Sequence, residues 1–60
     1  MDKGKVLKAE GIVAHVLLEL SDAMDLMTDS YVTYDQEAFD NARAACQALK
    51  NQLRNLRSSL

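Results

Sequence analysis

The stretch from Val6 to Met27, VLKAEGIVAHVLLELSDAMDLM, decides the fold, because its apolar residues recur every three or four positions. A second stretch, from Phe39 to Leu60, FDNARAACQALKNQLRNLRSSL, repeats that spacing. The recurring positions are Val6, Ala9, Val13, Val16, Leu20, Ala23 and Met27, and then Phe39, Ala42, Cys46, Leu49, Leu53, Leu56 and Leu60. This spacing places one apolar side chain per turn on a single helical face, which must be buried against another element. The pattern therefore predicts an all-α fold, an antiparallel two-helix hairpin.

Polar residues between the two stretches predict the link of this hairpin. Thr28, Asp29 and Ser30 are poor helix formers, so we expect the first helix to end there. Thr33 and Gln36 have the spacing of a capping box, which predicts the start of the second helix. The expected elements, within one domain over residues 1–60, are a helix at about 4–28, a link at about 29–33 and a helix at about 34–58. Two helices of similar length joined by a short link are typical of antiparallel neighbours.

Both ends of the predicted hairpin carry residues suited to closing it. Asp2 is placed to cap the first helix, because a carboxylate oxygen there accepts a hydrogen bond from a free backbone N–H. At the other end we expect Tyr31 or Val32 to fold over Phe39 or Ala38.

Composition excludes several broad classes of protein. The net charge of -2 is too small to indicate a nucleic acid or a membrane surface by itself. Glu10, His15 and Glu19 interrupt the apolar residues, so we expect neither a signal peptide nor a membrane-spanning segment. Cys46 is the single cysteine and lies in an apolar stripe, which indicates a small core residue rather than a disulfide framework. We therefore expect a reduced, cytoplasmic setting.

The first helix carries more apolar surface than one neighbouring helix can cover. Ile12 and Leu26 lie on one flank of its stripe, and Leu17 and Met24 lie on the other. This apolar arc is wide enough for two neighbours. A second copy of the chain is the simplest second neighbour, and it would give a four-helix bundle. The residues expected in the core of the hairpin or of the dimer are Val13, Val16, Leu17, Leu20, Met24, Met27, Phe39, Cys46, Leu49, Leu53 and Leu56.

Charged residues are sorted along the predicted hairpin. The basic residues of the open end are Lys3, Lys5, Lys8, Arg54 and Arg57. The acidic residues of the link end are Asp22, Asp25, Asp29, Asp35, Glu37 and Asp40. Two hairpins laid in the same direction would bring like charges together, whereas a head-to-tail pair brings opposite charges together. We therefore expect an antiparallel homodimer, in which surface pairs worth about 0–1 kcal/mol each select the orientation.

Few residues are suited to catalysis or to metal binding. His15 has Glu19 one turn away, but no serine or cysteine lies on the same face for it to activate. Asp22, Asp25 and Asp29 share one helical face, but the loop geometry and the glycine of a calcium site are missing. We therefore expect no enzymatic activity, no cofactor and no metal ion.

Two surfaces remain as candidates for binding a macromolecule. Tyr31, Tyr34 and Leu18 leave apolar surface for a partner protein, unless the two tyrosines only cap the core. Along the second helix runs a basic ridge that could follow a phosphate backbone or could simply be a solvated face. The basic residues of this ridge, which Gln47 extends, are Arg43, Lys50, Arg54 and Arg57. Because the ridge lacks aromatic residues and the same helix starts with acidic ones, nucleic acid is the weaker candidate.

In outline, the pair of stretches from Val6 to Met27 and from Phe39 to Leu60 resembles the Rop-type hairpins. Proteins of that family dimerise into antiparallel bundles and regulate plasmid copy number by binding paired RNA loops, although their turn is tighter than this link. The outline is also similar to small co-chaperones of secretion systems and to small phage proteins that inhibit host proteins. This resemblance implies a bacterial or phage-like small protein. We expect a non-catalytic module that binds a partner protein as a regulator, inhibitor or co-chaperone, with RNA-binding regulation as the alternative.

Overall fold

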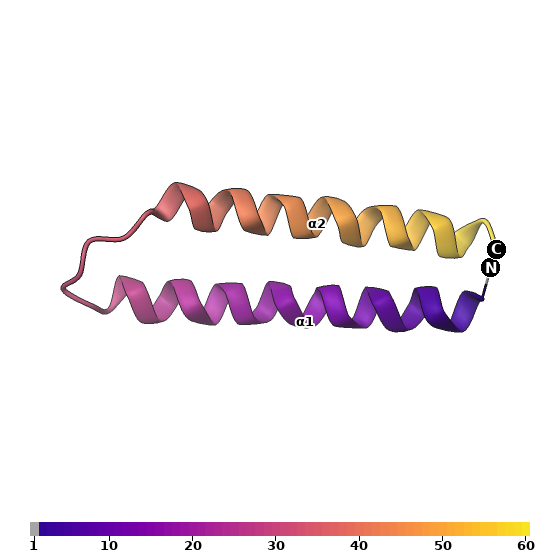
Figure 1. Cartoon of the computed structure of the whole chain (residues 1–60), viewed down its shortest axis with the longest axis horizontal. Coiled ribbons are helices and arrows are strands. Elements are labelled where there is room, and N and C mark those ends of the chain that lie inside the picture. The colour runs from indigo at the N-terminus through magenta and orange to yellow at the C-terminus, as the bar shows by residue number, and fades with distance from the viewer. Residues whose placement is uncertain (1) are drawn as a thin grey trace.

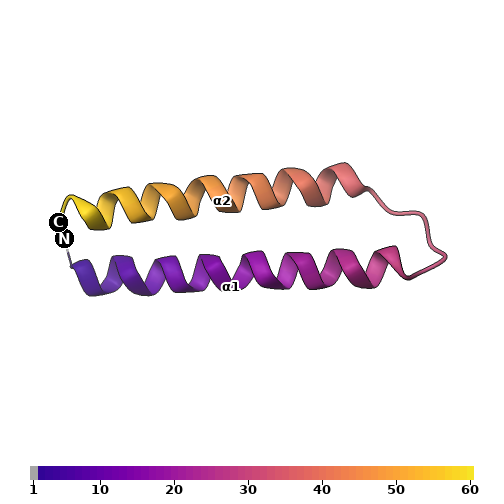
Figure 2. The same ribbon diagram turned by 180° about the vertical axis from the view of Figure 1, so that it is seen from behind.

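Two helices make up most of the chain. In this computed structural model, which describes residues 2–60, α1 spans Lys3–Thr28 and α2 spans Gln36–Ser58. The helices run side by side in opposite directions, with both termini at one end and the link at the other (Figure 1). Seen from behind, they form the same single layer (Figure 2), and the described residues extend over 47 × 16 × 11 Å. The predicted all-α helical hairpin is therefore confirmed. Within residues 2–60, neither helix contains a segment both long and apolar enough to cross a bilayer.

Aspartates cap both helices at their N-termini. The Asp2 carboxylate accepts a hydrogen bond from the Gly4 backbone N–H at 2.8 Å, as predicted. The Asp35 carboxylate accepts one from the Ala38 backbone N–H at 3.1 Å, so α2 begins at Gln36 and the link covers residues 29–35. The capping box predicted at Thr33 was therefore wrong, and the second helix starts two residues later than expected.

Tyr34 explains this later start. A helix beginning at residue 34 would place Tyr34 in its first turn, but here Tyr34 lies in the extended link and closes the end of the hairpin. Its ring packs edge-to-face on Phe39, with ring centroids 5.8 Å apart and an interplanar angle of 82°. Its hydroxyl lies 3.0 Å from the Thr28 Oγ1 at the end of α1. The residue that covers Phe39 is thus Tyr34, whereas Tyr31 and Val32, which we had expected there, are exposed.

The seam between the helices follows a seven-residue repeat. Side chains of α1 that are buried or half-buried alternate in steps of four and three residues along Val6, Glu10, Val13, Leu17, Leu20, Met24 and Met27. The half-buried residues of α2 are Phe39, Ala42, Cys46, Lys50, Leu53, Leu56 and Arg57. Two helices that stay in contact over their whole length need this repeat, because an ideal helix drifts away from a straight partner.

This seam differs from the predicted stripe at three turns of α1. At these turns the predicted stripe contained Ala9, Val16 and Ala23. In the structure the next residue of each turn faces α2 instead, namely Glu10, Leu17 and Met24. Leu17 and Met24 are longer than the side chains they replace, and they fill the space between the helices better. As a consequence, Val16 is left 41% exposed on the edge of the seam.

Candidate interaction surfaces

An ion pair joins the helices near the open end of the hairpin. Glu10 of α1 is only 8% exposed, and both of its carboxylate oxygens accept hydrogen bonds from Arg57 of α2. The Arg57 Nε donates to Oε2, and Nη2 donates to Oε1 at 3.3 Å. The Arg57 side chain is 33% exposed, so the pair is only partly shielded from water. Two parallel hydrogen bonds from a planar fork fix the orientation of both side chains.

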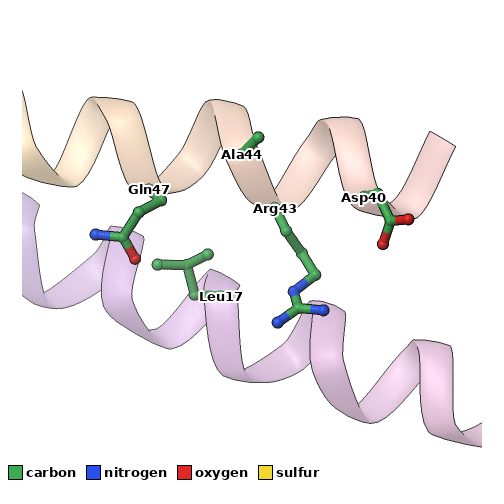
Figure 3. Close-up of a pocket in the computed structure, with 5 residues that line it drawn as sticks. All are labelled: Leu17, Asp40, Arg43, Ala44 and Gln47. Atoms are coloured by element: carbon green, nitrogen blue, oxygen red, sulfur yellow. The ribbon is translucent and has the colours of Figure 1, made fainter. Parts of the chain in front are cut away.

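The position of Arg57 defines one side of the hairpin, which we call the basic side. Arg43 and Lys50 lie on the same flank of α2, because they precede Arg57 by two and by one seven-residue repeats. A shallow hollow of about 270 Å³ lies between the helices here, lined by Leu17, Asp40, Arg43, Ala44 and Gln47. Figure 3 shows Arg43 and Gln47 extending from α2 toward α1, near Leu17. The hollow is lined by no serine, threonine, cysteine or histidine.

The opposite side of the hairpin exposes large apolar side chains, which we call the apolar face. They are Ile12 (59% exposed), Val16 (41%) and Leu26 (74%) in α1, and Leu49 (45%) in α2. Val16 precedes Leu17 of the seam by one residue, and Leu49 precedes Lys50 of the basic side by one residue. One residue corresponds to a rotation of about 100° around a helix. The side chains of Val16 and Leu49 are therefore turned away from the basic side. Glu19 lies seven residues after Ile12 and seven before Leu26, so it separates Leu26 from Ile12, Val16 and Leu49. Exposed apolar residues on one side of a small protein are typical of an interaction surface.

The residues predicted to bind a partner protein lie in separate places. Tyr31 at the link is fully exposed, and Val32 beside it is exposed as well. Tyr34 is half-buried and engaged with Phe39, so it contributes to the closed end of the hairpin. Leu18 is exposed, but it lies ten residues before the end of α1, which is about 15 Å along the helix. The structure therefore does not bring Leu18 together with the tyrosines.

The basic ridge is only partly free to contact a ligand. Arg43 and Arg54 are exposed and Lys50 is half-buried, whereas Arg57 is engaged with Glu10. A ridge with one of its four basic side chains already neutralised offers less positive charge to a phosphate backbone than its sequence suggests.

The residues with a potential for chemistry are dispersed over the surface. The His15 Nε2 lies 3.6 Å from the Glu19 Oε1, and both side chains are largely exposed. Cys46 is a half-buried free thiol of the seam, as its place in the apolar stripe predicted. Among residues 2–60, no three His, Cys, Asp or Glu side chains are grouped closely enough to hold a metal ion.

Sequence reasoning missed the structural part played by Glu10, which was treated as a polar interruption of the apolar residues. A signal for it was present. Glu10 occupies the position between Val6 and Val13 that a seven-residue repeat assigns to the seam, and Arg57 flanks Leu56 near the end of the other helix. An acid and a base on facing positions at the same end of a hairpin are placed to pair.

These features define a small all-α helical hairpin with an apolar side, a basic side and an exposed tyrosine at its tip. Comparison of the chain with protein-family models finds no match, and neither does comparison with curated proteins or with solved structures.

Proposed function

We propose that this chain is a small non-catalytic interaction module. Two copies of the chain pair into an antiparallel four-helix bundle. This bundle acts as a regulator, inhibitor or co-chaperone by binding a partner protein. The observation that carries the proposal is the apolar face, where Ile12, Val16, Leu26 and Leu49 meet water on one side of the molecule. Covering such surface is favourable in water, and in a hairpin of two helices only another molecule can cover it.

The accessible area of the hairpin supports self-association. The hairpin exposes 4610 Å², whereas a compact folded chain of its 6.7 kDa is expected to expose about 3,900 Å². Its radius of gyration is 14.3 Å, compared with about 10 Å for a compact domain of this length. The excess of about 700 Å² is close to the roughly 800 Å² that each partner buries in an ordinary stable interface. A second copy laid on the apolar face would therefore bury about as much area as the hairpin exposes in excess.

The tip of the hairpin is the surface that we assign to the partner protein. Tyr31 and Val32 are exposed in the link between the helices, where Asp29 and Asp35 add negative charge. Tyrosine provides a large contact area with few rotatable bonds, which is why interfaces are enriched in it. An antiparallel bundle has one such tip at each end. The free Cys46 thiol is compatible with a reducing compartment such as the cytoplasm.

Sedimentation and affinity capture test the two parts of this proposal. Sedimentation equilibrium between about 1 and 100 μM should give the mass of a dimer, and a well-ordered monomer over that range would contradict self-association. Capture from the native host should then retain a protein on the wild-type chain that the Tyr31→Ala variant fails to retain. Tyr31 is fully exposed, so this variant keeps the fold, and Val32→Ser is a milder companion at the same tip. A partner retained equally by all three would refute the assignment of the tip.

RNA binding is the second candidate, and the exposed Arg43 and Arg54 on α2 favour it. It predicts an affinity that falls steeply with salt concentration and is lost when both arginines are changed to glutamate. The ion pair of Arg57 with Glu10 and the acidic residues Glu37 and Asp40 at the start of α2 reduce the positive charge of this surface. For this reason we favour the protein partner.

A further inference from the structure

We propose that the apolar face is the self-association surface and that a second copy lies on it head to tail, with Val16 and Leu49 on the two-fold axis. This inference rests on the proposed self-association through the apolar face and adds to it the register and the pairing of each helix with its own equivalent. It implies that α1 packs on α1 of the second copy and α2 packs on α2.

The choice of face follows from the Glu10–Arg57 ion pair. That pair turns the polar flank of α2, with Arg43 and Lys50, to one side of the hairpin. A copy docked on the basic side would have to dehydrate these cations, and of the two only Arg43 has a carboxylate, that of Asp40, lining the same hollow. The apolar face carries Ile12, Val16, Leu26 and Leu49, which are stabilised by leaving water, and Glu19, between Ile12 and Leu26, is 65% exposed and can stay at the rim. The basic side therefore stays in solvent, and the apolar face is covered.

Two face-to-face arrangements with two-fold symmetry are possible. When the axis runs along the hairpin, both copies point the same way, and α1 of one packs on α2 of the other. When the axis runs across the hairpin, the copies point in opposite directions, and each helix packs on its own equivalent. In both arrangements the same apolar face is used by each copy, as symmetry requires.

Charge complementarity selects the head-to-tail arrangement. With an axis at Val16, residue 3 of α1 lies level with residue 29 of the second copy, so the basic open end of each copy lies at the height of the acidic link end of the other. Lys8 lies at nearly the same height as Asp25 of the second copy, although both side chains lie outside the apolar face. The same-direction arrangement would instead place the open end, with Lys3, Lys5 and Arg54, beside the open end of the other copy. These charges act through solvent and not in direct contact, so each interaction is weak, but the two arrangements differ in the sign of the interaction between the ends of the hairpins.

The register follows from the heights of Val16 and Leu49. Glu10 pairs with Arg57, so six residues further along α1 Val16 is level with Asn51, which is two residues, or about 3 Å, from Leu49. Val16 also lies at the middle of α1, with Ala9 and Ala23 seven residues before and after it. A reversed copy centred on Val16 therefore places Ala9 opposite Ala23 of the second copy. Two alanines allow the closest approach of the helices on either side of the central valines.

Thiol trapping distinguishes the two arrangements. In a Cys46→Ser background, Val16→Cys alone should be converted to a covalent dimer by mild oxidation or a short thiol-reactive cross-linker, and so should Leu49→Cys alone. The matched control is Leu18→Cys, which is exposed on the outer surface of α1 and should give at least tenfold less dimer. Circular dichroism of each variant checks that the helices are intact.

Two results would overturn the inference. A covalent product that forms only when the Val16→Cys and Leu49→Cys chains are mixed would show the same-direction arrangement. Sedimentation as a dimer without trapping at either position would show that another face is used, while the proposed self-association would stand. A monomer at 100 μM would instead refute self-association itself. As a second measurement, Val16→Glu should raise the dimer dissociation constant at least tenfold, whereas Leu18→Glu should leave it within threefold.

Discussion

Replacing Arg57 with methionine should destabilise the protein by about 2 kcal/mol, because it leaves the Glu10 carboxylate buried without its partner. Glu10 is 8% exposed and loses both of its hydrogen bonds in this variant. Breaking a fully buried ion pair from one side costs about 3–5 kcal/mol. Here the Arg57 side chain is 33% exposed, so water reaches the site and the cost falls below that range.

Removing Glu10 instead of Arg57 should destabilise the protein less, so the stabilities of the two variants can be compared directly. In the Glu10→Leu variant, Arg57 is left unpaired, but its long side chain can turn its guanidinium into water, at a cost of about 1 kcal/mol. In the double variant both charges are absent and the methionine can pack against the leucine, so its stability should lie within about 1 kcal/mol of the wild type. The coupling energy between the two positions should therefore be about 2–3 kcal/mol.

Urea unfolding followed by circular dichroism at 222 nm measures these differences. All variants must be compared at one protein concentration, because self-association contributes to the apparent stability. Arg54→Met is the matched control, since Arg54 is an exposed arginine three residues earlier on the same helix and its loss should change stability by less than about 0.5 kcal/mol. If Arg57→Met changes stability no more than this control does, and the coupling energy is near zero, then the ion pair contributes nothing and the reasoning is refuted.

Three further substitutions test the seam and the caps. Leu53→Ala should cost about 2 kcal/mol or more in the same unfolding experiment, because Leu53 is half-buried in the seam; a loss under 0.5 kcal/mol would place it outside the core. Asp35→Ala should cost about 1 kcal/mol and Thr33→Ala less than about 0.5 kcal/mol, and the opposite order would restore the capping box at residue 33. Tyr34→Phe keeps the packing on Phe39 but loses the contact with the Thr28 hydroxyl, so it should cost about 0.5–1 kcal/mol, whereas a Tyr34→Ala loss of equal size would show that the ring contributes nothing.

Apolar spacing alone was sufficient to predict the two helices and their pairing. Two runs of three- and four-residue spacing with no proline leave a helix as the only regular structure that buries one face. The Asp2 cap was predictable for the same local reason, because a capping side chain acts within its own turn. Structural features that depend only on residues within one helical turn of each other can be predicted from the amino-acid sequence.

The second cap was not predictable in this way, because a contact across the hairpin decides it. Thr33 with Gln36 and Asp35 with Ala38 are both acceptable starts for a helix by local criteria. The packing of Tyr34 on Phe39 and its hydroxyl contact with Thr28 at the end of α1 keep Tyr34 out of α2. A tertiary contact thus chose between two local signals of similar strength.

The position of the seam had the same kind of cause, and it bears directly on function. The apolar arc of α1 extends from Ile12 and Leu26 on one flank to Leu17 and Met24 on the other, so the sequence indicated two neighbours without saying which flank each would cover. The packing of Leu17 and Met24 between the helices and the pairing of Glu10 with Arg57 both turn the Leu17 flank toward α2. Rotating α1 by one residue to bury Val16 instead would carry the Glu10 carboxylate about 100° away from Arg57 and break that pair. The same ion pair that joins the helices therefore keeps Val16 and Ile12 uncovered, and the exposed flank is a consequence of how the hairpin closes rather than a defect in its packing.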